Sequence, residues 1–133
     1  MILVEPQWYE VPERWPVIEP WVKRALARGA VNYDAADIRR ELLCRDMKLW
    51  LAMDGSRIAA CCITKLGAYP KLRICSIIVI GGTGMANWLH FKSEIEAYAR
   101  ENGAEALEGV GRTGWERAAK DWDKVATIYR KML

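Results

Sequence analysis

The sequence predicts a mixed α+β fold, with a mostly antiparallel central sheet of about six strands flanked by about four helices. Three observations predict this class. Short apolar stretches surround a hairpin turn, apolar residues recur with helical spacing elsewhere, and a glycine-rich junction joins the two kinds of pattern. The chain has 133 residues, 52% of them hydrophobic, which is enough for one compact core. We therefore expect a single domain over residues 1–133.

Composition and charge narrow the class of function. The chain carries 20 basic and 17 acidic residues, interleaved along the sequence rather than gathered in a basic block. We therefore expect no nucleic-acid partner. No apolar run approaches the roughly 20 residues that span a membrane, and the first residues lack the basic, then apolar, layout of a signal peptide. We expect no membrane association and a cytoplasmic location.

Metal-binding and nucleophilic side chains are sparse. No two of the four cysteines have the Cys-x-x-Cys spacing of a zinc site, and His90 is the only histidine. The sequence therefore predicts no metal site. Three of the cysteines, Cys61, Cys62 and Cys75, lie in apolar stretches, where a free thiol packs as a small hydrophobic group. For His90 we favour a structural role on a helix over a catalytic one.

The first third of the chain is expected to hold one strand and two helices. Residues 1–7 fit a short strand, and prolines at positions 12, 16 and 20 are then expected to break the segment up. Pro20 suits the first turn of a helix, in which apolar residues recur until Gly29 ends the pattern. Asp34 is a candidate N-cap for a second helix, from Ala35 to about Arg45, with one apolar face.

Three strands follow at short intervals. The pattern predicts strands over Lys48–Met53, Arg57–Leu66 and Leu72–Ile80. Asp54-Gly55 is a hairpin turn signal between the first two, and Gly67–Pro70 forms a looser turn before the third. These segments are expected to form an antiparallel meander, with the β-branched end of the third strand buried on both faces.

The last third of the chain alternates helices and strands. An apolar stripe predicts a helix that ends near Asn102-Gly103; the stripe consists of Met85, Trp88, Leu89, Ile95 and Ala99. A strand is expected over Glu105–Val110, and the crossover through the helix would make it parallel to the Leu72–Ile80 strand. Thr113 and Glu116 fit a capping box that begins a short helix through Asp121. Alternating side chains then predict a final strand, Val125–Met132.

The stretch SIIVIGGTGMANW, residues 76–88, leads from a strand through glycines into a helical pattern. Glycine lets the backbone approach a ligand closely, and the first turn of a helix presents unpaired N–H groups to an anion. Glycines also make tight turns. The local sequence leaves both interpretations open, a phosphate site and a turn.

The order of these elements resembles that of the GNAT (GCN5-related N-acetyltransferase) family over nearly the whole chain. The junction GGTGMA and the C-terminal GRTGWERAAKDWDKV support this likeness, and the second segment also resembles small GNAT-like proteins encoded by tailed bacteriophages. The resemblance implies a fourth strand that carries a bulge and splays from a parallel fifth strand. It also implies acetyl-CoA as cofactor, with its pantetheine arm in the gap between those strands.

In that family, backbone N–H groups of an Arg/Gln-x-x-Gly-x-Gly/Ala loop hold the pyrophosphate. Gly82-Thr83-Gly84 or Gly84-Met85-Ala86 can fill the glycine positions, but Val79 or Gly81 then stands at the leading Arg/Gln position. The loss of that side chain implies weaker cofactor binding. The candidate cofactor-binding residues are Ile80, Gly81, Gly82, Thr83, Gly84, Met85, Ala86 and Asn87.

The catalytic residues of the family are harder to match. A tyrosine on the short helix between the last strands usually protonates the leaving thiolate, whereas this sequence has Trp115 and Trp122 there. The acceptor amine also needs a base, and the strand Leu72–Ile80 offers no carboxylate. We therefore assign no catalytic residue. Arg112 and Trp115 are substrate-binding candidates, although a surface ion pair and aromatic core packing are the more ordinary explanations.

Two functions remain open from the sequence. One is an acyl-CoA-dependent N-acetyltransferase with a reduced cofactor motif, acting on a small-molecule or protein amine in the cytoplasm. The other is a catalytically inactive GNAT-like phage protein, either a virion component or a module that contacts a host protein. The missing Arg/Gln and tyrosine favour the second function, and the retained glycines favour the first. The fold alone does not decide between them.

Overall fold

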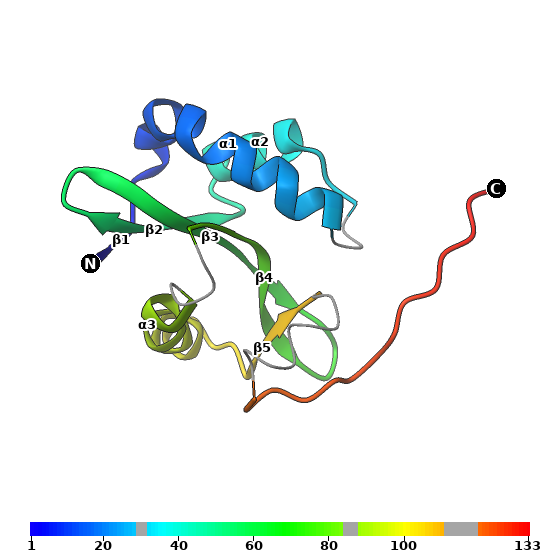
Figure 1. Cartoon of the computed structure of the whole chain (residues 1–133). Helices are drawn as coiled ribbons and strands as arrows, with labels where there is room; N and C mark the ends of the chain where they lie inside the picture. The colour runs from blue at the N-terminus through cyan, green and yellow to red at the C-terminus, as the bar shows by residue number, and fades with distance from the viewer. Residues whose placement is uncertain (29–31, 84–87, 111–119) are drawn as a thin grey trace.

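Five strands form one sheet in the order β1-β2-β3-β4-β5 (Figure 1). The structure is a computed structural model that describes residues 1–28, 32–83, 88–110 and 120–133, with backbone alone for residues 88–90. Neighbouring strands from β1 to β4 run antiparallel, and β5 runs parallel to β4. The predicted mixed α+β class and the antiparallel meander are confirmed. The strands are β1 (Ile2–Val4), β2 (Lys48–Asp54), β3 (Arg57–Ala68), β4 (Arg73–Gly82) and β5 (Ala106–Gly109).

Helices cover both faces of the sheet (Figure 1). A 3-10 turn, η1 (Trp8–Glu10), leads into α1 (Val11–Arg28), which packs with α2 (Ala35–Leu43) on one face. The crossover helix α3 (Trp88–Glu101) covers the other face. Each face therefore has its own apolar core. Among the described helices, none is both long enough and apolar enough to cross a membrane.

Helix α1 runs through the prolines that were expected to break it. Pro12, Pro16 and Pro20 are all exposed, because their spacing of four residues places them together on the outer face of the helix. There, water can bond the carbonyl groups that a proline leaves without an N–H donor. Burial of the opposite face outweighs the lost hydrogen bonds. The prediction of a helix beginning only near Pro20 was therefore wrong. The buried face consists of Val11, Trp15, Ile18 and Val22.

Helix α2 begins where the sequence predicts, after Asp34. The Asp34 carboxylate accepts a hydrogen bond from the Asp37 backbone N–H at 2.8 Å, and the Asp37 carboxylate accepts one from the Asp34 N–H at 3.0 Å. The bond from the Asp34 backbone lowers the pKa of the Asp37 carboxyl. The helix ends slightly earlier than expected because Arg45 adopts a left-handed backbone, with φ of 66°.

The crossover after β4 also follows the prediction. Ile95 and Ala99 are buried on the sheet-facing side of α3, together with Phe91. Gly103 follows the helix with φ of 79°, a conformation that favours glycine at a helix end. The chain then returns as β5, which pairs with β4 in parallel as expected.

The chain beyond β5 departs from the prediction. The expected helix through Asp121 lies almost wholly in residues 111–119, outside the described part. Residues 124–133, here called the C-terminal tail, were expected to form a strand over Val125–Met132. They have no strand pairing with the described sheet and extend outward from the region of β5 (Figure 1). Side-chain alternation alone does not make a strand, because its backbone groups need partners at a sheet edge.

One polar side chain is buried in the core under α3. Thr64, 1% exposed, accepts a hydrogen bond at 3.0 Å from the Trp50 indole N–H across the β2–β3 ladder. Trp50 packs edge-on against Tyr98 of α3, with ring centroids 5.2 Å apart. The Thr64 hydroxyl therefore allows a large aromatic side chain to be buried with its one polar group paired.

Replacing Thr64 with Val tests the contribution of this bond. The change keeps the shape but leaves the Trp50 N–H without an acceptor, so we expect the free energy of unfolding to fall by about 1–3 kcal/mol. In a Trp50→Phe background, which lacks the N–H, the same Thr64→Val change should cost clearly less. Urea unfolding followed by circular dichroism measures both differences. Equal costs in the two backgrounds would show that the hydrogen bond contributes nothing.

Candidate functional site

Strands β4 and β5 are paired over only the first half of β4. Their parallel pairing begins at Ile74 with Ala106 and ends at Ile77 with Gly109, the last residue of β5. Strand β4 continues over residues 78–82, where, among the described residues, it is paired with β3 alone. The edge of β4 on the β5 side therefore has no described strand partner over its second half. The splay that the sequence resemblance implies stays a prediction, because residues 111–119 after β5 lie outside the described part.

A β-bulge lies directly after the last residue of β4 that pairs with β5. Ile63 of β3 pairs with Val79 and the next residue, Thr64, pairs with Ile77, so Ile78 has no partner in the register. As a result, Ile78 and Val79 pack on the same core, under α1 and α2, instead of alternating between faces. A bulge bends its strand and increases the local twist, so β4 changes direction just beyond Ile77.

The glycines that end β4 are required by close packing. A Cβ atom on Gly81 would come within 2.7 Å of the Trp21 Cβ on α1. A Cβ atom on Gly82 would lie 2.5 Å from the Ala59 carbonyl oxygen, and Gly82 has a positive φ of 125°. Side chains at these positions would therefore collide with α1 and β3. Close packing at the end of β4 therefore accounts for both glycines without a ligand.

Thr83 is held by β3 as well. Its backbone N–H donates to the Ala59 carbonyl at 3.0 Å, and its hydroxyl donates to the same oxygen at 3.1 Å. The Thr83 amide is therefore already in use. Ile80 belongs to the β3–β4 ladder, where it pairs with Cys62. The other candidate cofactor residues lie outside the described residues, between β4 and α3; they are Gly84, Met85, Ala86 and Asn87.

The candidate substrate-binding residues also lie outside the residues that the structure describes. Arg112 and Trp115 lie in the segment 111–119, and the side chain of His90 is not described. Their assignments stay predictions. Trp122 is described, and its ring lies 3.8 Å from where a Cβ on Gly109 would be, beside the end of β5. There it packs with the core under α3.

The sequence analysis missed a charged cluster beside β4. Lys65 of β3 forms a 2.6 Å ion pair with Glu41 of α2, and its ammonium lies 5.9 Å from the centre of the Tyr33 ring. The hydrogen bond to Glu41 raises the pKa of Lys65. Across the ladder Lys65 pairs with Ser76, next to the last residue of β4 that pairs with β5. The one sequence feature that could have indicated this ion pair is Lys65, a charged residue within an apolar strand. Its partner Glu41 lies 24 residues away in the sequence.

The cysteines supply no reactive thiol at this site. Cys61, Cys62 and Cys75 are buried in the two cores, and burial raises the pKa of the Cys61 thiol to about 12. The prediction that these three pack as small hydrophobic groups is confirmed. Cys44, at the end of α2, is exposed. Within the part of the chain that the structure describes, no three His, Cys, Asp or Glu side chains are placed to bind a metal.

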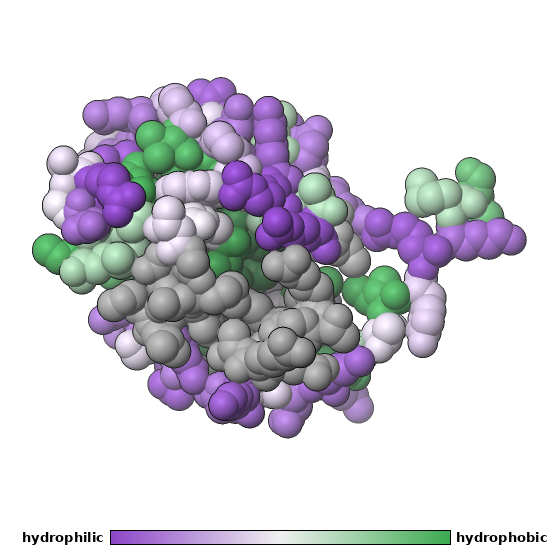
Figure 2. All heavy atoms as spheres, viewed as in Figure 1, coloured by the Kyte–Doolittle hydropathy of each residue, from purple (hydrophilic) through white to green (hydrophobic). Residues whose placement is uncertain are grey.

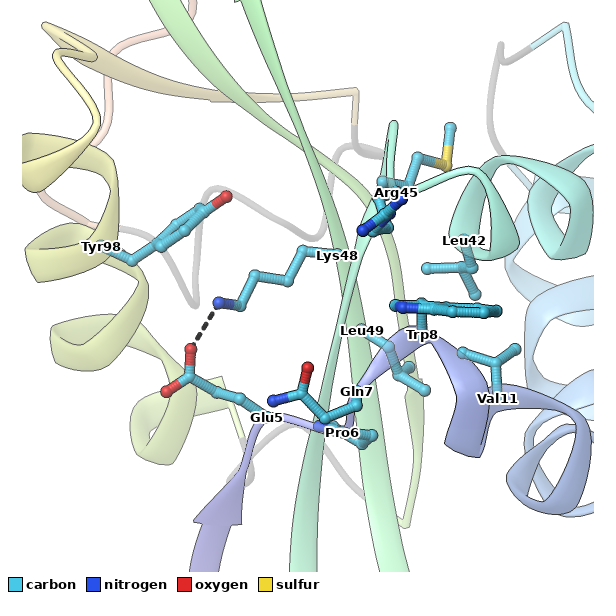
Figure 3. A pocket seen from close by; sticks show the side chains of 11 residues that line it. Glu5, Pro6, Gln7, Trp8, Val11, Leu42, Arg45, Lys48, Leu49 and Tyr98 are labelled. Atoms are coloured by element: carbon cyan, nitrogen blue, oxygen red, sulfur yellow. Dashed lines mark ion pairs between the residues drawn. The ribbon is translucent and has the colours of Figure 1, made fainter.

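A separate hollow of about 440 Å³ lies beside the N-terminal end of β2, where η1 and α3 flank it (Figure 3). Lys48 there forms a 2.6 Å ion pair with Glu5 and lies 4.4 Å from the centre of the Tyr98 ring. Arg45 lies over the Trp8 ring, 5.6 Å from its centroid. Both cations are thus engaged by neighbouring side chains. We assign no chemistry to this hollow, and the edge of β4 beyond Ile77 is the candidate site.

Comparison with solved structures identifies the fold. No family model and no curated protein matches the sequence. The crystal structure of a probable acetyltransferase aligns with a TM-score of 0.75 at 11% identity, covering 100% of this chain and 97% of that one. A predicted acetyltransferase from Clostridium acetobutylicum, solved with acetyl-CoA, gives a TM-score of 0.70 at 13% identity, covering 99% and 94%. The chain has a GNAT-like fold.

A third structure extends the likeness. It is a ribosomal-protein-alanine N-acetyltransferase from Brucella melitensis biovar Abortus 2308, with a TM-score of 0.66 at 14% identity, covering 98% of this chain and 99% of that one. Identities this low establish the GNAT-like fold alone. The activity has to be argued from the site.

Gly82→Ala tests the packing role of the junction. The positive φ and the contact with the Ala59 oxygen should lower the free energy of unfolding by about 2–4 kcal/mol. Gly55→Ala is the matched control, because Gly55 also has a positive φ, 62°, but nothing lies within 4 Å of the new Cβ. Its cost should stay near 1 kcal/mol, roughly the penalty of the left-handed backbone alone. Chemical unfolding measures both, and equal losses would contradict the packing argument.

Proposed function

We propose that this protein is an acetyl-CoA-dependent N-acetyltransferase that holds the pantetheine arm of the cofactor between β4 and β5. The observation that carries the proposal is the end of the β4–β5 pairing at Ile77, next to the Ile78 bulge, which leaves one backbone edge of β4 without a strand partner among the described residues. A solved structure of the same fold contains acetyl-CoA, which supports this choice of cofactor.

An open strand edge suits a thioester, because backbone N–H groups can donate to the carbonyl oxygen as negative charge develops on it. The acceptor's amine nitrogen attacks the carbonyl carbon, a C–N bond forms, and the C–S bond breaks. The proton lost by the amine passes, through water or a side chain, to the departing thiolate of CoA. We assign no acid or base, so positioning and backbone donors would supply most of the rate. Arg112 and Trp115 stay the proposed acceptor-side residues.

The cofactor's diphosphate is expected to be held weakly. Val79 or Gly81 stands where the family loop has Arg or Gln, and the Thr83 amide already donates to Ala59. The remaining proposed donors are the backbone N–H groups of residues 84–87, directly ahead of α3. We therefore expect submillimolar rather than tight binding.

The alternative function is a GNAT-like phage protein without catalysis, acting in a virion or on a host protein. The missing Arg/Gln side chain favours it, and so does the missing tyrosine before the last strand. Tyr129 is the only tyrosine beyond β5, and it lies in the C-terminal tail, 90% exposed. The likeness of GRTGWERAAKDWDKV to phage proteins is the further support for this alternative.

Titration calorimetry with acetyl-CoA separates the two functions. We expect the folded protein to bind acetyl-CoA, and Gly84→Asp to weaken that binding by roughly tenfold or more, because a carboxylate would block and repel the diphosphate. Gly55→Asp is the matched control. It makes the same change at the tip of the β2–β3 hairpin, where nothing lies within 4 Å of a new Cβ, and it should bind as the wild type does.

Three outcomes would count against the enzyme proposal or its site. If the folded wild type gives no heat of binding with acetyl-CoA, the enzyme proposal is wrong. If Gly84→Asp binds acetyl-CoA as tightly as the wild type does, or if both variants weaken binding equally, the diphosphate does not bind at the glycine junction. If the wild type does not bind, co-purification of the chain with assembled phage particles would support the alternative.

A further inference from the structure

The outer edge of β5 is unpaired in the described sheet. Strand β5 is last in the strand order and pairs with β4 on its inner side. A groove of about 370 Å³ lies beside it, between α3 and the residues that lead into the C-terminal tail. An exposed strand edge beside a partly apolar groove is a template for another strand. The apolar lining includes Ala99, Ala106, Leu107, Trp122 and Val125.

The C-terminal tail has residues typical of a strand, but it is not paired with the described sheet. Its VATIY stretch, residues 125–129, holds β-branched and aromatic residues that favour strands. Figure 1 shows the tail running outward, and Figure 2 shows hydrophobic and hydrophilic side chains mixed along the extension. The exposed apolar residues include Val125 at 81%, Ile128 at 58%, Tyr129 at 90% and Met132 at 83%.

We propose that the C-terminal tail of one copy adds as a strand to the outer edge of β5 in a second copy, which returns its own tail in the same way. Such a two-fold exchange pairs both unpaired edges. It also removes two sets of exposed apolar side chains from water. The partner that fits this edge is therefore a second copy of the same chain.

Charge complementarity supports the tail as the occupant of the groove. Acidic side chains around the groove outnumber the basic Arg100; they are Glu96, Glu105, Asp121 and Asp123. The tail carries Lys124, Arg130 and Lys131 and no acidic residue. Opposite charges on the two surfaces favour their association and set their orientation.

The direction of the tail favours pairing with β5 of a second copy rather than with β5 of its own chain. Val125 still lies beside the groove. By Arg130, however, the tail has reached the link between α1 and α2, where the guanidinium donates to the Asn32 side-chain oxygen at 2.7 Å. The tail thus leads away from the β5 edge of its own chain, and its apolar side chains face solvent, where another molecule can meet them.

Sedimentation velocity over a concentration series tests the exchange. We expect the wild type to dimerise and Ile128→Pro to raise the dimer dissociation constant by roughly tenfold or more, because proline removes a backbone N–H from the added strand. Ile128→Val keeps a β-branched side chain and should dimerise as the wild type does. Added salt should weaken the dimer. A monomeric wild type, or a dimer that Ile128→Pro leaves unchanged, would overturn the proposal.

Cross-linking then identifies which chain supplies the strand. A Cys44→Ser variant with Glu108→Cys in β5 and Lys131→Cys in the tail is made in light and heavy isotope forms, refolded as a mixture and treated with a bismaleimide. Links between the tail of a light copy and the β5 of a heavy copy would support the exchange. Tail-to-β5 links confined to one isotope form would show that each tail pairs with its own β5, against the proposal.

Discussion

The bulge at Ile78 is the constraint on which the candidate site depends. The ladder with β3 holds β4 to its last residue, Gly82, and the extra residue at Ile78 bends the strand just beyond Ile77. The pairing with β5 ends at Ile77 with Gly109. Backbone pairing therefore decides which part of the β4 edge has no described strand partner.

Close packing and the proposed phosphate site concern successive parts of the glycine junction. Gly81, Gly82 and Thr83 lock the end of β4 against α1 and β3, so packing explains their presence. The phosphate hypothesis then depends on residues 84–87, just before α3, where the first N–H groups of a helix have no intrahelical partner. The two roles are compatible, because a rigid end to β4 fixes the direction from which the next residues meet a ligand.

Elements that depend on interactions between residues close in the sequence could be predicted. Elements that depend on residues far along the chain could not. The Asp54-Gly55 turn and the Asp34 cap each act within a few residues, and both were recognised correctly. The prolines of α1 misled because their common exposed face appears only once the whole helix is considered. The family resemblance implied a bulge in this strand, but its position is hidden because residues 77–80 are all apolar, so no alternation marks which face each one takes. The Glu41–Lys65 pair and the unpaired tail depend on partners far along the chain or outside it.

Strand β5 connects the candidate site to the proposed exchange of tails. Its end at Gly109 lies opposite Ile77, where the unpaired edge of β4 begins, and its outer edge is where a second copy would add a strand. The described contacts that position it come from β4, from α3 and from Trp122. An added strand would restrict its movement and hold the proposed gap beside β4 at one width. If acetyl-CoA favours one position of β5, cofactor binding and strand exchange must change each other's affinity by the same factor, because a coupling free energy between two sites is reciprocal.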